Sequence, residues 1–136
     1  MIESSLVLYN DRLVSISKGT PSSVEFNFGE IWDYSKTITD FDADNFDFYH
    51  VHPIGINSYS ETDLNCMIGY QIAFGKSVFF HIIIFENSDL NSLVHTRKTY
   101  VLKPDREVLD ITDIIDDSLT DCSLALLKRL SYGDMK

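Results

Sequence analysis

The N-terminal part of the chain alternates between apolar and polar residues with a period of two, the spacing of a half-buried strand. Residues 5–9 are mostly apolar and residues 12–17 alternate, with an Asn-Asp turn signal between them. Together these segments predict a β-hairpin. The alternation returns at residues 23–28 and leads into residues 31–34, where we expect further strand.

The middle of the chain predicts a strand, a proline turn and a helix. Residues 37–45 are polar and acidic and predict a loop, whereas the aromatic residues 46–52 predict a strand that ends at Pro53. Apolar residues then recur at helical spacing within residues 60–74, and Gly75 lies just past the expected helix end.

The last part predicts three strands and a closing helix. Residues 77–85 are nearly continuous in β-branched and aromatic side chains, as in a central strand buried on both faces. Residues 98–102 and 108–111 predict two further strands, and residues 118–130 predict a helix. The order predicts an α/β (α+β) fold, a mixed β-sheet flanked by helices, and we interpret residues 1–136 as a single domain.

Charge and composition narrow the classes of partner. Eleven Lys and Arg against 21 Asp and Glu give a formal net charge of −10, so we expect no nucleic acid partner. No apolar stretch approaches a membrane span and no leader pattern follows Met1, which indicates a cytoplasmic protein and no membrane partner. Cys66 and Cys122 lack CxxC spacing and predict free thiols packed among apolar residues. The acidic residues 40–47 and 105–121 are typical of solvated faces and leave open an oligomer or a basic partner subunit.

The strongest chemical signal lies at the end of the aromatic strand. His50 and His52 are two residues apart, so on a strand their imidazoles project from one face and can bind one ion. Pro53 turns the chain out of the sheet, and the following loop can return Asp63 to the histidines as a third ligand. Three protein ligands with a water in the fourth position are typical of catalytic zinc.

These residues also match a known signature. Residues 50–53 (HVHP), six further residues and residues 60–63 (SETD) resemble, at every fixed position, the H-x-H-P, six residues, S-x-x-D signature of the JAMM/MPN (JAB-type) zinc metalloprotease family. The resemblance covers roughly residues 3–111, because the strand and helix signals follow the family's order. It implies the cytidine-deaminase-like core of that family.

The resemblance implies roles for four of these residues. His50, His52 and Asp63 would hold Zn²⁺, and Ser60 would help to position the bound water and the tetrahedral intermediate. Ser60 and Asp63 also match a helix N-cap with an acid in the first turn, which requires no metal. The two interpretations are compatible.

The family's general acid and base is a glutamate that starts a strand upstream of the histidines. Glu3, followed by small and apolar residues, resembles that stretch. Glu25 and Glu30 are alternatives, but they leave less chain for the two intervening strands. Family members usually carry a strand and a helix before this glutamate, a place that the closing helix can fill here.

Two classes of function fit these residues. The first is a zinc-dependent metallopeptidase or isopeptidase, deubiquitinase-like in family terms, acting on a protein or peptide substrate such as a ubiquitin-like conjugate. Another amide, in a metabolite or a cell-wall peptide, would need the same activated water. The alternative is a non-catalytic MPN-type protein–protein interaction module, because the same fold serves as a scaffold. Scaffold members generally lose metal ligands, so the ligands present here favour the hydrolase.

The remaining histidines and the aromatic residues predict structural roles. His81, inside an apolar strand, is typical of a hydrogen-bonded core histidine, whereas His95, beside polar residues, predicts an exposed side chain. Aromatic residues mostly at strand spacing predict core packing, namely Phe26, Phe28, Trp32, Phe46, Phe48 and Tyr49.

Overall fold

The computed structural model of the protein describes residues 1–117 and 119–133. Its centre is a six-stranded sheet with the spatial order β2 (Arg12–Lys18), β1 (Ser4–Tyr9), β3 (Phe46–Val51), β4 (Phe79–Phe85), β5 (His95–Leu102) and β6 (Val108–Asp110). β3 and β4 are parallel, and every other neighbouring pair is antiparallel. The central place of β4 is confirmed, and six of its seven residues are buried.

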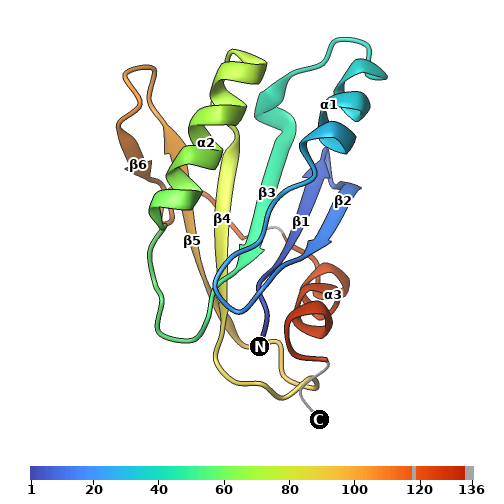
Figure 1. The fold of residues 1–136 in the computed structure, drawn as a ribbon, viewed down its shortest axis with the longest axis vertical. Helices are drawn as coiled ribbons and strands as arrows, with labels where there is room; N and C mark the ends of the chain where they lie inside the picture. Colours follow the sequence, from blue (N-terminus) through green and yellow to red (C-terminus); the bar gives the residue numbers. More distant parts are fainter. Residues whose placement is uncertain (118, 134–136) are drawn as a thin grey trace.

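Helices cover both faces of this sheet and make three layers (Figure 1). α1 (Phe28–Lys36) and α2 (Glu61–Phe74) lie on one face, and α3 (Asp121–Tyr132) lies on the other. Because strand side chains alternate, Phe48 packs toward α2 while its neighbour Tyr49 packs toward α3. This architecture confirms the predicted α+β class with a mixed sheet.

The predicted hairpin and the predicted α2 helix are both confirmed. Asn10 and Asp11 connect β1 to β2 with φ of 48° and 65°, the left-handed pair of a type I′ turn. Ser60 caps the start of α2, and Gly75 ends it with φ of 73° in the left-handed conformation. α2 is therefore the crossover that joins the parallel strands β3 and β4.

The expectation of strand across residues 23–34 is wrong. Residues 24–27 have no regular structure, and the helix α1 begins at Phe28. Asn27 provides the local cause, because its side chain accepts from the Glu30 N–H and caps the helix. Ile31 and Ser35, one helical turn apart, then face the core.

The closing helix is confirmed in place and type. α3 begins after its N-cap Thr120 and extends to Tyr132; Ser118, where we predicted its start, lies outside the described residues. Leu124 and Leu127 pack onto the sheet face opposite α1 and α2. Within residues 1–117 and 119–133, no helix combines the length and apolarity that a bilayer crossing requires.

Candidate metal centre

Two neighbouring strands bring three titratable side chains together at one end of the sheet. β1 and β3 are antiparallel, and Ser5 pairs with His50. Two residues back from Ser5 and two residues on from His50, the same register places Glu3, just before β1, beside His52, just after β3. One ligand atom from each of Glu3, His50 and His52 lies within 4.8 Å of the other two, and all three residues are buried. Strand pairing thus assembles residues that are far apart in the chain.

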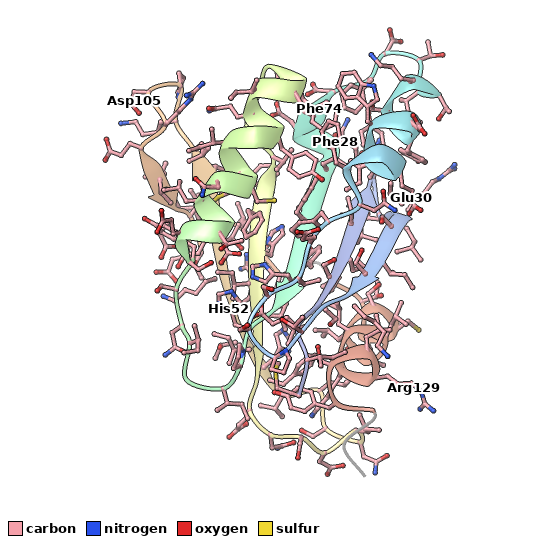
Figure 2. The ribbon with its side chains drawn as sticks, in the orientation of Figure 1. Phe28, Glu30, His52, Phe74, Asp105 and Arg129 are labelled. Carbon is pink, nitrogen blue, oxygen red and sulfur yellow. The ribbon has the colours of Figure 1, made fainter. Side chains whose placement is uncertain are left out.

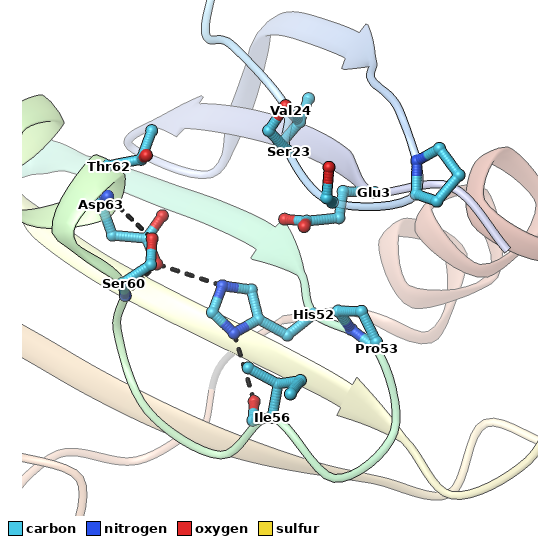
Figure 3. Close-up of a pocket in the computed structure, with 11 residues that line it drawn as sticks. Glu3, Ser23, Val24, His52, Pro53, Ile56, Ser60, Thr62 and Asp63 are labelled. Carbon is cyan, nitrogen blue, oxygen red and sulfur yellow. Dashed lines mark hydrogen bonds and ion pairs between the residues drawn. The ribbon is translucent and has the colours of Figure 1, made fainter.

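His52 is oriented by the loop that follows it. Its backbone N–H donates to the Ile83 carbonyl at 3.0 Å, and Pro53 then turns the chain out of the sheet. The His52 Nδ1–H donates to the Ile56 carbonyl at 3.2 Å, because a carbonyl can only accept. Nε2 is thereby directed at α2, where Asp63 Oδ2 lies 3.1 Å away (Figure 3).

Asp63 is positioned by the N-terminus of α2. Its Oδ2 accepts from the Ser60 N–H at 2.8 Å, and Ser60 Oγ accepts from the Asp63 N–H at 3.1 Å, which completes a capping box. Asp63 Oδ1 lies 3.2 Å from His50 Nε2. Burial disfavours the Asp63 carboxylate, yet the two histidines hold its pKa well below the ordinary value. The predicted N-cap is confirmed, and it aims the carboxylate at both imidazoles.

The two histidines have different electrostatic environments. Both ring nitrogens of His50 are buried without a hydrogen-bond partner among the described residues, because the close approach of Asp63 lacks hydrogen-bond geometry. Burial lowers the pKa of the His50 imidazole despite the opposing effect of Asp63, which favours the neutral form of this ring. Burial also disfavours the charged form of His52, but its bond to Asp63 raises the pKa of that imidazole. His50 therefore offers an unshared lone pair inside the protein.

Glu3, the residue directly before β1, faces the histidines. Its Oε1 lies 3.9 Å from His50 Nε2, and the side chain points toward the space between His52 and Asp63 (Figure 3). Burial raises the pKa of the Glu3 carboxyl; the Asp63 charge acts in the same direction, and His52 acts against it. A raised pKa makes this carboxylate a stronger base than an exposed glutamate, which suits it to proton transfer.

Backbone and side-chain hydrogen bonds hold Glu3 in this position. The Glu3 N–H donates to the Thr20 carbonyl and the Gly19 N–H donates to the Glu3 carbonyl, each at 2.8 Å. On the opposite side of the sheet, Ser4 Oγ lies 2.6 Å from Ser131 Oγ of α3. The strand that carries Glu3 is thus tied both to the turn after β2 and to the closing helix.

A pocket of about 270 Å³ opens beside these groups. Glu3, His52, Ser60 and Asp63 line it, and the irregular segment at residues 21–24 forms the facing wall. His50, only 1% exposed, lies outside this lining. The chemical groups therefore face a space that a small part of a substrate can enter.

The structure brings all five predicted site residues together: Glu3, His50, His52, Ser60 and Asp63. The alternatives Glu25 and Glu30 are exposed and lie outside this group, and Figure 2 shows Glu30 on α1 well away from His52. Sequence reasoning missed the pocket wall at residues 21–24 and the contact of Ser4 with Ser131. The alternation of residues 23–28, which begins within this wall, favoured a strand, and no local pattern reveals a contact across 127 positions.

The other histidines and cysteines are placed away from the centre. His81 is 3% exposed and bonds Asp47 and Thr99, which confirms a core histidine. His95 is half-buried rather than exposed, because its Nε2 lies 2.8 Å from Asp117 Oδ2. Both cysteines are free, but Cys122 is exposed, so its predicted apolar packing is wrong.

Not every predicted aromatic side chain is part of the core. Phe46, Phe48 and Tyr49 are buried, as expected. Phe28 is 46% exposed beside a partly buried Trp32, with the two rings stacked at 5.8 Å. The aromatic surface at the start of α1 is therefore accessible to solvent.

Comparison with known proteins identifies no relative of this chain. No protein-family model matches the chain, and no curated protein matches its sequence. The centre itself combines nitrogen and carboxylate donors beside a pocket, an arrangement that could hold a metal ion.

Proposed function

We propose that this protein is a zinc-dependent peptidase or isopeptidase of the JAMM/MPN type, which cleaves an amide bond in a protein or peptide substrate. The observation that carries the proposal is the buried pair His50 and His52, which is grouped with Glu3, lies within 3.2 Å of the Asp63 carboxylate and sits beside a pocket. The finer fold assignment, a cytidine-deaminase-like JAMM/MPN core, belongs to the same proposal.

The donor set fits a zinc ion. Zinc bonds of 2.0–2.1 Å in a tetrahedron separate neighbouring ligand atoms by about 3.3 Å. Asp63 Oδ1 lies 3.2 Å from His50 Nε2, and Asp63 Oδ2 lies 3.1 Å from His52 Nε2. Each distance is close to that spacing. His50 provides a neutral nitrogen without a hydrogen-bond partner among the described residues, and a metal ion would supply the missing contact. His50, His52 and Asp63 would therefore hold the ion.

Glu3 has the features of a general acid and base rather than a fourth ligand. Its 3.9 Å separation from His50 Nε2 exceeds the spacing made by Asp63, and its raised pKa favours proton transfer. A zinc ion held here would supply water activation near neutral pH and polarisation of the amide carbonyl. Glu3 would take the proton from the attacking water and deliver it to the leaving amine.

Ser60 and the surrounding elements would support this chemistry. The Ser60 oxygen accepts from the Asp63 N–H, and the Ser60 hydroxyl donates no hydrogen bond among the described residues. The Ser60 hydroxyl can therefore donate a hydrogen bond to the oxyanion that forms on the substrate carbonyl. The Ile56 carbonyl fixes the His52 tautomer, so that Nε2 is the nitrogen presented to the ion.

The pocket favours an extended substrate segment. Its volume of about 270 Å³ excludes a folded domain, but it admits a narrow chain with its amide bond. The C-terminal tail of a ubiquitin-like modifier joined to a lysine side chain has this form, as does an unfolded peptide. We therefore propose a protein or peptide conjugate as the substrate.

Metal content tests the proposal. We would measure zinc by mass spectrometry in the native protein, in His52→Ala and in Asp63→Ala, with His95→Ala as a control histidine outside the centre. We expect about one zinc per chain in the native protein and the control, and loss in both site variants. A fluorogenic isopeptide substrate would then compare Glu3→Gln with the matched Glu25→Gln, and only the first should lower hydrolysis by about 10²-fold or more.

The alternative function predicts the opposite results. If zinc reconstitution leaves the native chain without metal, the hydrolase proposal fails and the non-catalytic interaction module becomes the better explanation. If zinc binds but Glu25→Gln rather than Glu3→Gln abolishes hydrolysis, the assignment of Glu3 fails while the metal centre stands.

A further inference from the structure

A second cavity continues from the metal centre along α2. Its volume is about 360 Å³, and Val24 and Thr62 line both this cavity and the pocket at the metal centre. Figure 3 shows these two residues on the side of the pocket away from His52 and Pro53. A chain bound across the metal centre can therefore extend into the second cavity without leaving the surface.

The walls of this cavity are mainly apolar, with one charge at the rim. Residues of the segment before α1 form one side, and residues of α2 form the other: Val24, Glu25, Phe26, Phe28, Thr62, Cys66, Gly69 and Tyr70. Glu25 is exposed, and Phe28 leaves 46% of its surface accessible. Such a cavity favours an apolar side chain, since burial removes apolar surface from water on both partners.

Gly69 is unexplained by the packing of the protein itself. It lies inside α2, where glycine costs about 0.5–1 kcal/mol relative to alanine. A Cβ built at Gly69 would meet no atom within 4 Å, so no neighbouring group requires the absence of a side chain. An occupant that approaches the helix backbone would require it.

Tyr70 provides an independent sign of a polypeptide ligand. Its ring is 4% exposed, yet its hydroxyl is buried without a hydrogen-bond partner among the described residues. Buried hydroxyls normally have partners. A turn of the Tyr70 ring toward the cavity would bring this hydroxyl within reach of a peptide carbonyl, and the same peptide supplies an apolar side chain for the walls.

We propose that this cavity, which we name the α2 subsite, receives a large apolar side chain of the substrate polypeptide, such as leucine or phenylalanine, close to the scissile amide. The location next to the metal centre rests on the proposed peptidase function, whereas occupation of the cavity does not. The α2 subsite would thus select the substrate sequence, while the metal centre would perform the cleavage.

Binding of small amino acid amides tests the α2 subsite without any need for catalysis. We would titrate N-acetyl-leucine amide and N-acetyl-phenylalanine amide into the ¹⁵N-labelled protein, with N-acetyl-aspartate amide as the polar probe. We expect saturable shifts of the Val24, Cys66 and Gly69 amide signals with the two apolar probes. The absence of such shifts with both apolar probes, or equal shifts with the polar probe, would overturn the proposal.

A filled subsite should lose this binding. In Gly69→Leu the new side chain enters the open space and should weaken apolar probe binding by about tenfold or more. Asn65→Leu, which adds the same side chain to an exposed α2 position outside the cavity, is the matched control and should bind like the native protein. Unchanged binding in Gly69→Leu would overturn the proposal. Thermal unfolding checks that both variants are folded, which we expect because leucine has a higher helix propensity than glycine or asparagine.

Hydrolysis then separates the two proposals. A fluorogenic peptide library should show preference for leucine or phenylalanine at one position near the cleaved bond, lost in Gly69→Leu but kept in Asn65→Leu. Apolar binding without any hydrolysis by the zinc-loaded protein would support the α2 subsite and contradict the peptidase. Hydrolysis that does not discriminate apolar from acidic side chains would contradict the α2 subsite alone.

Discussion

Two buried histidine–aspartate clusters occupy the same sheet, and they differ in whether their nitrogens have partners. At one end of the strands, His50 lies 3.2 Å from Asp63 but has no hydrogen bond to either ring nitrogen among the described residues. His81 on the adjacent strand, in contrast, bonds Asp47 Oδ1 through Nε2 and Thr99 Oγ1 through Nδ1, each at 2.7 Å. The two rings are equally buried, at 1% and 3% exposure.

The comparison shows that burial and residue type do not identify a metal centre. The His81 cluster satisfies its nitrogens within the protein, since Asp47 accepts from Nε2–H and the Thr99 hydroxyl donates to Nδ1. Arg97 in turn donates to Thr99 Oγ1. A metal at His81 would have to displace these bonds, whereas a metal at His50 would complete the bonding of the ring. The His50 cluster is therefore distinguished by ring nitrogens that have no hydrogen-bond partner among the described residues and lie near a pocket.

Glu3→Gln should cause the greatest loss of activity, and it separates metal binding from proton transfer. The amide cannot accept a proton, so hydrolysis of a fluorogenic isopeptide should fall by about 10²–10⁴-fold. Zinc content should remain that of the native protein, because Glu3 lies 3.9 Å from His50 Nε2, beyond the Asp63 spacing. Loss of zinc together with activity would instead make Glu3 a ligand, as its 4.8 Å grouping with both histidines also permits.

A matched pair of substitutions, His50→Gln and His81→Gln, tests whether only the histidine without hydrogen-bond partners binds the metal. His50→Gln should weaken zinc binding by more than about 100-fold, since even residues that only orient ligands contribute 10–100-fold. His81→Gln should leave zinc affinity unchanged. Competition with a chromophoric chelator measures both affinities, and equal losses in the two variants would remove the distinction between the clusters.

The same pair should behave in the opposite way in metal-free unfolding. His81→Gln disturbs two buried hydrogen bonds and should lower the free energy of unfolding by about 1–3 kcal/mol. His50→Gln should lower it less, because the native imidazole nitrogens have no bond to lose among the described residues. Zinc at about 100 times its dissociation constant should then stabilise His81→Gln by about 2.7 kcal/mol, as in the native protein, and His50→Gln hardly at all. Urea titrations with and without zinc give all four values.

Sequence patterns predicted most of the fold because the decisive features are local. The Asn10-Asp11 turn, the aromatic strand that carries His50 and the Ser60 cap each depend on neighbours in the chain, and each is confirmed. The prediction of strand before Ile31 was wrong. The alternation of residues 23–28 favoured a strand, but Asn27 caps a helix that begins at Phe28. An N-cap stabilises a helix by about 1 kcal/mol, which is enough to favour helix where no neighbouring strand is present to pair with the alternating segment.

The candidate site was predictable where spacing alone brings residues together. The two-residue spacing of His50 and His52 and the cap at Asp63 place three groups without knowledge of the sheet order. Glu3 required the resemblance to a known family, because the pairing of β1 with β3 is a long-range choice. The unpartnered nitrogens of His50 and the open space at Gly69 are properties of packing, which no spacing reveals.

Ser131→Ala should have the smallest effect and tests whether α3 positions Glu3. The substitution removes the 2.6 Å contact with Ser4 but keeps the backbone bond from the Ile2 N–H to the Ser131 carbonyl. One hydrogen bond is worth about 0.5–1.5 kcal/mol, so hydrolysis should fall by about 2–10-fold while zinc affinity stays unchanged. In the Glu3→Gln background the same substitution should cause no further loss, because a positioning residue acts only through the group it positions. An equal loss in both backgrounds would show that Ser131 contributes to stability alone. The closing helix would then have a purely structural role, like the His81 cluster, and no role in positioning Glu3.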